Sequence, residues 1–205
     1  MINLPKSCLV DKFLAKKLFY EKANASQSVK KQFIDNVDKI TWMYKISQDT
    51  ININKTEDVE EIQVFELLLK QKCDLKEIIN VLTKKIPYPI LFHIKYDEEF
   101  QYAIKYNDKI CYSEWNKDID FNFSGLNLNL VYKDIVRKIN NIDELNDIDK
   151  ELEKLKQINE LEKQIKALDN KIRKEKQFKI KAEYNHRRNE LIEEISRLRD
   201  KNERM

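Results

Sequence analysis

Residues 142–205 have the sequence IDELNDIDKELEKLKQINELEKQIKALDNKIRKEKQFKIKAEYNHRRNELIEEISRLRDKNERM, which contains neither glycine nor proline. Leucine and isoleucine recur in it every three or four residues, a spacing that keeps apolar side chains on one side of a helix. This pattern predicts a coiled-coil extension after a first domain of residues 1–141. The predicted oligomerisation seam consists of Leu152, Leu155, Ile158, Leu161, Ile165, Leu168, Ile172, Leu191, Ile195 and Leu198.

The extension has two possible forms. One continuous helix would be a rod of roughly 90 Å, at about 1.5 Å per residue. A lone helix cannot bury its apolar stripe, so either two chains pair along it as a homodimer, or it folds back near residues 169–177 and packs on itself. The absence of a glycine or proline turn signal favours the continuous rod.

The first 141 residues have the pattern of an ordinary globular domain. Apolar and polar residues alternate in segments at 40–46, 61–70, 90–96, 100–106 and 110–115, which predicts strands, and 50–53 is expected to be extended. Helical spacing occurs at 29–34, 75–82 and 130–139. We therefore predict an α+β fold: a mostly antiparallel sheet with packed helices, followed by a long C-terminal coiled-coil helix or helical hairpin.

The composition excludes several classes of function. With one glycine in 205 residues, a glycine-rich phosphate loop is improbable, and we expect no cofactor. Cys8, Cys73 and Cys111 are widely separated, and His93 and His186 have no second ligand nearby in the sequence, so no metal site is predicted. Neither a signal peptide nor a long apolar span occurs, so we expect a cytoplasmic protein that does not enter a membrane.

Positive charge is concentrated in one part of the extension. The formal net charge of the chain is only +3, but residues 171–188 carry eight basic residues against Glu175 and Glu183. Such an excess fits contact with phosphates, although a solvated coil surface explains it equally well. Phe178 in the same segment instead suggests a protein-docking anchor. The candidate nucleic-acid or partner-binding residues are Lys171, Arg173, Lys174, Lys176, Phe178, Lys179, Lys181, Arg187 and Arg188.

Several segments together resemble a known family: Leu4–Phe13, Lys39–Ile46 continuing to Thr50–Ile53, Glu61–Glu66, Ile86–Phe92, Ser113–Trp115 and Glu175–Phe178. They are similar to the bacterial domain-of-unknown-function family numbered four-three-nine-one, over nearly the whole chain. The resemblance carries no activity and no catalytic residue. It implies a setting beside helicases and DNA methyltransferases of restriction-modification or phage-defence systems.

The leading hypothesis is a non-enzymatic accessory subunit of such a system. Its head would bind a helicase or methyltransferase, while the coil would mediate oligomerisation or docking and its basic segment would contact DNA. The alternative is a divergent metal-dependent nuclease, in which acids and a lysine on adjacent strands hold a divalent metal and activate water. Its candidate residues are Asp49, Glu61, Gln63, Glu66 and Lys70.

Overall fold

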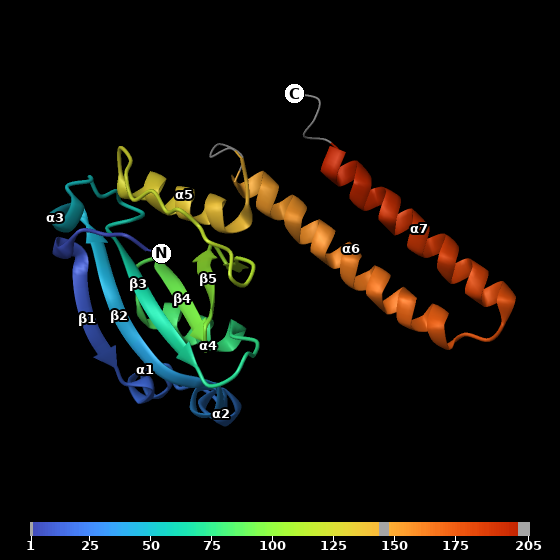
Figure 1. Cartoon of the computed structure of the whole chain (residues 1–205), viewed down its shortest axis with the longest axis horizontal. Helices are drawn as coiled ribbons and strands as arrows, with labels where there is room; N and C mark the ends of the chain where they lie inside the picture. Colours follow the sequence, from blue (N-terminus) through green and yellow to red (C-terminus); the bar gives the residue numbers. More distant parts are fainter. Residues whose placement is uncertain (1, 144–147, 201–205) are drawn as a thin grey trace. The chain divides into compact units, whose positions relative to one another are not determined.

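A computed structural model of the chain describes residues 2–143 and 148–200 (Figure 1). The chain divides into two units, residues 1–145 and 146–205. The predicted α+β class is confirmed, with a six-stranded, mostly antiparallel sheet and its helices followed by two long helices packed on each other. Residues 144–147 and 201–205 of the predicted coil lie outside the described residues. No helix among the described residues is long and apolar enough to cross a membrane.

The sheet of the first unit has its strands in the same order as the sequence. Neighbouring strands pair antiparallel, except that β3 and β4 are parallel because helix α4 (Lys76–Lys85) crosses between them. The β4–β5–β6 part is the predicted antiparallel meander. The strands are β1 (Leu9–Leu14), β2 (Val37–Ser47), β3 (Glu61–Leu69), β4 (Ile90–Tyr96), β5 (Glu99–Tyr106) and β6 (Lys109–Tyr112).

The main core lies between one face of this sheet and the helices packed on it. Alternate residues of a strand face opposite sides, so Phe65 and Leu67 of β3 share a face with Phe92 of β4. These side chains and Ile78 and Leu82 of α4 are at most 1% exposed. The remaining helices of the unit are the 3-10 turn η1 (Lys6–Cys8), α1 (Lys16–Lys22), α2 (Gln27–Asn36), α3 (Gln48–Ile51) and α5 (Leu128–Asn140).

One expectation about this unit is wrong. Residues 50–53 were predicted to be extended, but Thr50 and Ile51 belong to the one-turn helix α3. The side chains of Ser47 and Thr50 form a capping box, in which the Thr50 hydroxyl accepts the Ser47 N–H at 2.8 Å. Asn52 then ends the helix in the left-handed conformation, with φ 55°. The extended conformation that the β-branched residues favour is thus outweighed by the caps at the two ends of this short helix.

Asparagine and aspartate replace glycine in the turns of this chain. Both residue types tolerate positive φ because their short polar side chains bond locally. Every described non-glycine residue with positive φ is one of the two types, namely Asp11, Asn24, Asn52, Asp97, Asn107, Asn116 and Asn141. A sequence with a single glycine therefore still forms tight turns.

The second unit is a helical hairpin of α6 (Ile148–Lys174) and α7 (Phe178–Asp200), which lie side by side in Figure 1. The expectation of a continuous rod is therefore wrong. Residues 175–177 break the helix without glycine or proline, because the Glu175 carboxylate accepts the backbone N–H groups of Lys176 and Gln177, each at 2.8 Å. Folding back lets the second apolar stripe bury the first within one chain.

Candidate functional site

The basic segment predicted from the sequence surrounds the turn of the hairpin. We call residues 171–181 the hairpin tip: it comprises the last turn of α6, the three linking residues and the first turn of α7. Its only acidic residue is Glu175, whose carboxylate oxygen is engaged by two backbone N–H groups. The tip has six basic residues, all exposed: Lys171, Arg173, Lys174, Lys176, Lys179 and Lys181.

None of these six cations forms an ion pair with a described residue. The Lys171 ammonium lies 5.8 Å from the centre of the Tyr184 ring. In the rest of the described hairpin most lysines and arginines have a carboxylate partner, as Lys163 has in Glu160 at 3.8 Å, whereas Lys150 and Lys166 have none. The tip therefore has positive charge that the described residues leave uncompensated.

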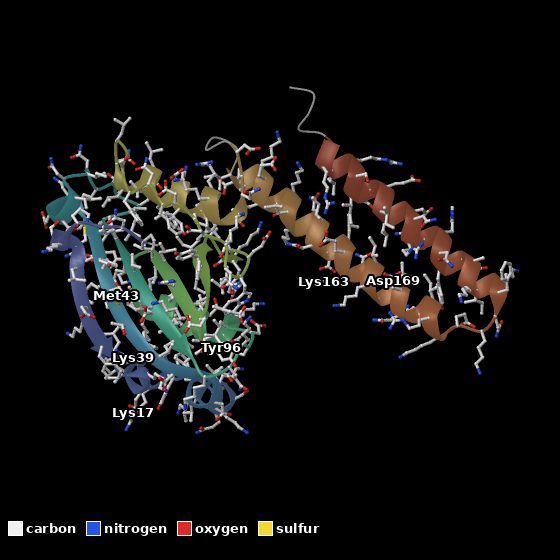
Figure 2. The ribbon with its side chains drawn as sticks, viewed as in Figure 1. Lys17, Lys39, Met43, Tyr96, Lys163 and Asp169 are labelled. Carbon is white, nitrogen blue, oxygen red and sulfur yellow. The ribbon has the colours of Figure 1, made fainter. Side chains whose placement is uncertain are left out.

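Arg187 and Arg188 were predicted to belong to the same basic surface, but their surroundings differ from those of the tip. Arg187 pairs with Glu190 at 2.8 Å on its own helix. Arg188 lies between the helices, with Nη1 3.5 Å from Asp169 Oδ1 of α6, the residue labelled in Figure 2. Both guanidinium groups thus already have carboxylate partners, so the structure separates them from the other predicted binding residues.

The seam residues line the contact between α6 and α7. Ile158, Leu191 and Ile195 are at most 7% exposed, and Leu152 is 6% exposed. The remaining members, Leu155, Leu161, Ile165, Leu168, Ile172 and Leu198, are half-buried. Phe178 behaves differently: it is the first residue of α7 and its side chain is 87% exposed, so it makes little contact with the hairpin.

The structure does not gather the five residues of the nuclease hypothesis into one cluster. Glu61 and Gln63 share one face of β3, where the Gln63 amide donates to Glu61 at 2.6 Å and Lys45 pairs with Glu61 at 3.2 Å. Glu66 lies on the opposite face and pairs with Lys95 at 2.7 Å.

The other two residues of that set lie apart from both groups. Asp49 is exposed on α3, and the Lys70 ammonium donates to the carbonyl oxygen of Ile34 at 2.9 Å. Within the described residues, no group of three or more His, Cys, Asp or Glu side chains is placed to hold a metal ion.

His93, the histidine on β4, is enclosed by aromatic rings. It stacks on Tyr102 with ring centres 5.1 Å apart and meets the edge of Phe100 at 5.9 Å. Burial, together with the nearby Lys95 ammonium, lowers the pKa of His93 to about 4, although Glu66 acts in the opposite direction. At neutral pH the imidazole is therefore uncharged and contributes to the packing of this face of the sheet.

Two features of the first unit had no signal in the sequence. One is a cavity of about 550 Å³ bounded by residues 86–90, the turn at 105–108 and the first turns of α5. Lys105 and Lys133 line it together with Asp58 and Asp108, so its charges cancel and favour no ligand class.

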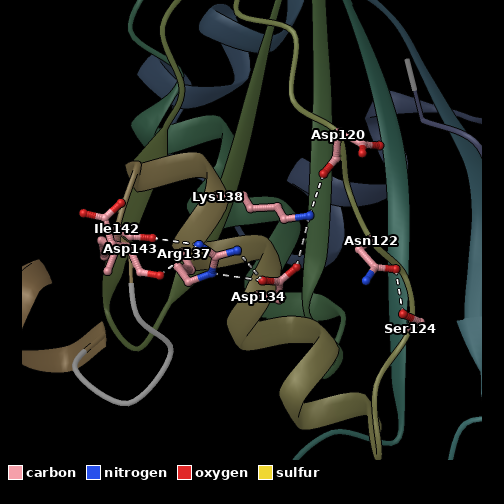
Figure 3. Close-up of polar contacts among 8 residues, drawn as sticks. All are labelled: Asp120, Asn122, Ser124, Asp134, Arg137, Lys138, Ile142 and Asp143. Atoms are coloured by element: carbon pink, nitrogen blue, oxygen red, sulfur yellow. Dashed lines mark hydrogen bonds and ion pairs between the residues drawn. The ribbon is translucent and has the colours of Figure 1, made fainter.

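The second feature is a network at the end of α5 (Figure 3). The Arg137 guanidinium donates to Asp134 Oδ1 at 2.8 and 3.0 Å, and also to the carbonyl oxygens of Ile142 and Asp143. Lys138 joins the same carboxylate, at 3.4 Å, and the carbonyl oxygen of Asp120, at 2.6 Å. The network fixes the backbone that follows α5.

Comparison with known proteins identifies a family but no relative of known function. A search of curated proteins found no match to this chain, and a search of solved structures found none either. The profile of one family, described as Domain of unknown function (DUF4391), matches residues 2–195. Because the match spans almost all of the 205 residues, this chain belongs to the DUF4391 family.

Proposed function

We propose that this chain is a non-enzymatic accessory subunit of a bacterial DNA-targeting defence system, and that its hairpin tip contacts the DNA backbone. The observation that carries the proposal is the set of six exposed cations at the tip without ion-pair partners among the described residues. The helicase or methyltransferase setting comes from the family resemblance described above. The head would dock on such a partner protein.

The geometry of a helix turn supports phosphate contact. At about 1.5 Å rise per residue and roughly 10 Å between helix axes, the Cα atoms of the six basic residues lie within on the order of 15 Å of each other. Their mutual repulsion is only partly screened at physiological salt, where the Debye length is about 8 Å. A duplex carries one negative charge per about 1.7 Å, so a bound backbone offers each cation a phosphate and releases counterions.

The test is binding of the full chain to a fluorescent duplex, followed by anisotropy between about 50 and 200 mM salt. The triple variant Lys174→Glu, Lys176→Glu, Lys179→Glu should bind at least tenfold more weakly, and the slope of log K against log salt should become shallower by about 3. The matched control is Lys55→Glu, Lys84→Glu, Lys85→Glu, which changes the net charge equally at exposed lysines of the head. An equal loss in both variants would show that only total charge matters and would contradict the proposal.

Partner docking needs its own test. The full chain would be used to capture purified helicase or methyltransferase proteins encoded beside it. Retention by the wild-type chain, and by the tip triple variant, would show that docking does not need the tip cations. Failure to bind any such protein would remove this part of the proposal and leave the DNA contact untouched.

A homodimer through the coil would have to take a different form from two paired rods. The seam of α6 is already covered by α7 of the same chain. A dimer using this seam therefore requires two chains to exchange their α7 helices, with residues 175–177 as the hinge. Sedimentation equilibrium distinguishes the cases: an exchanged dimer has twice the mass of a chain with a closed hairpin.

A further inference from the structure

Phe178 is exposed within the hairpin tip, where none of the six cations has an ion-pair partner among the described residues. Its side chain is 87% exposed, whereas the other apolar residues of the stripes lie against the opposite helix. A lone exposed apolar residue is ordinary. This one, however, is an aromatic ring flanked by Lys176 two residues before it and Lys179 directly after it. The tip thus presents an exposed aromatic ring in a segment rich in exposed basic residues.

We infer that the hairpin tip binds single-stranded nucleic acid in preference to duplex, with one base stacked on Phe178 and neighbouring phosphates on the flanking lysines. The inference deepens the proposed DNA contact and rests on it. Single strands expose the planar faces of their bases next to the charged backbone, and proteins bind them through aromatic platforms combined with cations. A duplex presents phosphates equally well but hides its base faces, which a side chain reaches only by unstacking a step.

The backbone around Phe178 is held by hydrogen bonds that do not involve its ring, so the ring is free to contact a ligand. The linking residues before it are held by the Glu175 carboxylate, which accepts the N–H groups of Lys176 and Gln177 at 2.8 Å each. The turn is therefore fixed without help from the ring. Immediately after it, Lys181 N–H donates to the Gln177 carbonyl at 3.0 Å and begins the ladder of α7. Helix and turn thus set the position of the ring, so stacking a base on it orders little additional backbone.

The number of cations limits the length of strand that the tip can hold. Six basic residues neutralise at most six phosphates, and single strands give a salt slope of about −0.7 for each phosphate neutralised. The slope for a short single strand should therefore not be steeper than about −4. Arg187 and Arg188 add nothing to this number because Glu190 and Asp169 already pair with them.

The experiment compares an oligothymidine of about 12 nucleotides with a duplex of the same length, binding to the full chain. Phe178→Ala should weaken single-strand binding by about 5- to 150-fold, the factor that stacking of one base contributes. Its duplex affinity and its salt slopes should stay the same. Phe178→Trp should restore single-strand binding, whereas Phe178→Leu, which is apolar without an aromatic face, should not. Because Phe178 is 87% exposed, none of these variants should alter the helix content seen by circular dichroism.

The outcomes separate this inference from the function on which it rests. If Phe178→Ala changes neither affinity while Lys174→Gln, Lys176→Gln, Lys179→Gln weakens both, the stacking inference fails and the backbone contact stands. If neither nucleic acid binds, both fail. If an oligoglutamate peptide binds with the same dependence on Phe178, the tip is a protein-docking site and the inference is overturned.

Discussion

Arg188 of α7 faces Asp169 of α6 across the hairpin, with 3.5 Å between Nη1 and Oδ1. The same side chain has a buried Nε atom with no hydrogen-bond partner among the described residues. A second cross-helix pair, Arg199 with Glu162 at 3.1 Å, lies further along. From the first pair to the second, the residue number falls on α6 (169 to 162) and rises on α7 (188 to 199), as expected for antiparallel helices.

Replacing Arg188 with an apolar residue of similar length should stabilise the hairpin. Arg188→Met removes the unpaired Nε group and keeps the packing of the stem, and the Asp169 carboxylate is 45% exposed and stays hydrated without its partner, so the free energy of unfolding should rise by about 1 kcal/mol. The change in unfolding free energy can be measured by hydrogen exchange of the α6 and α7 amides. Arg187→Met is the control, because that guanidinium is exposed and pairs on the surface. Lower protection in Arg188→Met would show that the pair with Asp169 outweighs the buried Nε.

The two seams should be required for the hairpin itself. Leu191 is 2% exposed and its neighbour Ile192 is 45% exposed. Leu191→Ala should lower the free energy of unfolding of the hairpin by about 2–3 kcal/mol, through lost burial and a cavity. Ile192→Ala should change it by less than about 1 kcal/mol. Urea titration followed by helix circular dichroism compares them, and equal losses would contradict the register described here.

Glu175 should hold the turn. Its carboxylate accepts two backbone N–H groups that Glu175→Ala would leave without a protein partner. We expect a loss of about 1 kcal/mol in hairpin stability, as for removal of a helix cap. Glu183→Ala serves as the control because Glu183 is exposed and has no ion-pair partner among the described residues. A variant in which the helix continued through 175–177 would instead show increased sedimentation mass, as two open chains pair.

The half-buried imidazole of His93 should make the first unit lose stability in mild acid. Its pKa is about 4 in the folded chain and about 6.5 when unfolded. Between these values the unfolded state binds more protons, so the free energy of unfolding falls as the pH falls from 6.5 to 4, by at most about 3 kcal/mol. His93→Gln should flatten that part of the profile. NMR titration of the imidazole checks the cause, and a midpoint near 6.5 in the folded chain would refute it.

Arg137 should secure the backbone after α5. Arg137→Lys keeps the charge but cannot reproduce the forked contacts with Asp134 and the carbonyl oxygens of Ile142 and Asp143. We expect the first unit to lose about 1–2 kcal/mol of unfolding free energy. Lys133→Ala, one turn earlier and without an ion-pair partner among the described residues, should have less effect. Thermal denaturation of the two variants compares these losses, and an equal loss in Lys133→Ala would contradict the role given to Arg137.

Local structure that depends on short-range sequence patterns was predicted correctly. The alternation at 90–96 and 100–106, with Asp and Asn at the turns between them, gave the antiparallel meander. The three- and four-residue spacing of leucine and isoleucine gave both long helices. The expectation that 50–53 is extended was wrong because the hydroxyl groups of Ser47 and Thr50 satisfied backbone groups locally and outweighed the preference of the β-branched residues.

The sequence alone was enough to predict the two apolar stripes, the concentration of positive charge at residues 171–188 and the family of the chain. That the two stripes cover each other within one chain could be seen only in the folded structure, because the turn depends on a carboxylate reaching backbone N–H groups and not on glycine or proline. The tertiary structure also decided which cations are uncompensated. Arg188 and Lys176 look alike in the sequence, but only the packing of α7 on α6 brings the Asp169 carboxylate within reach of Arg188.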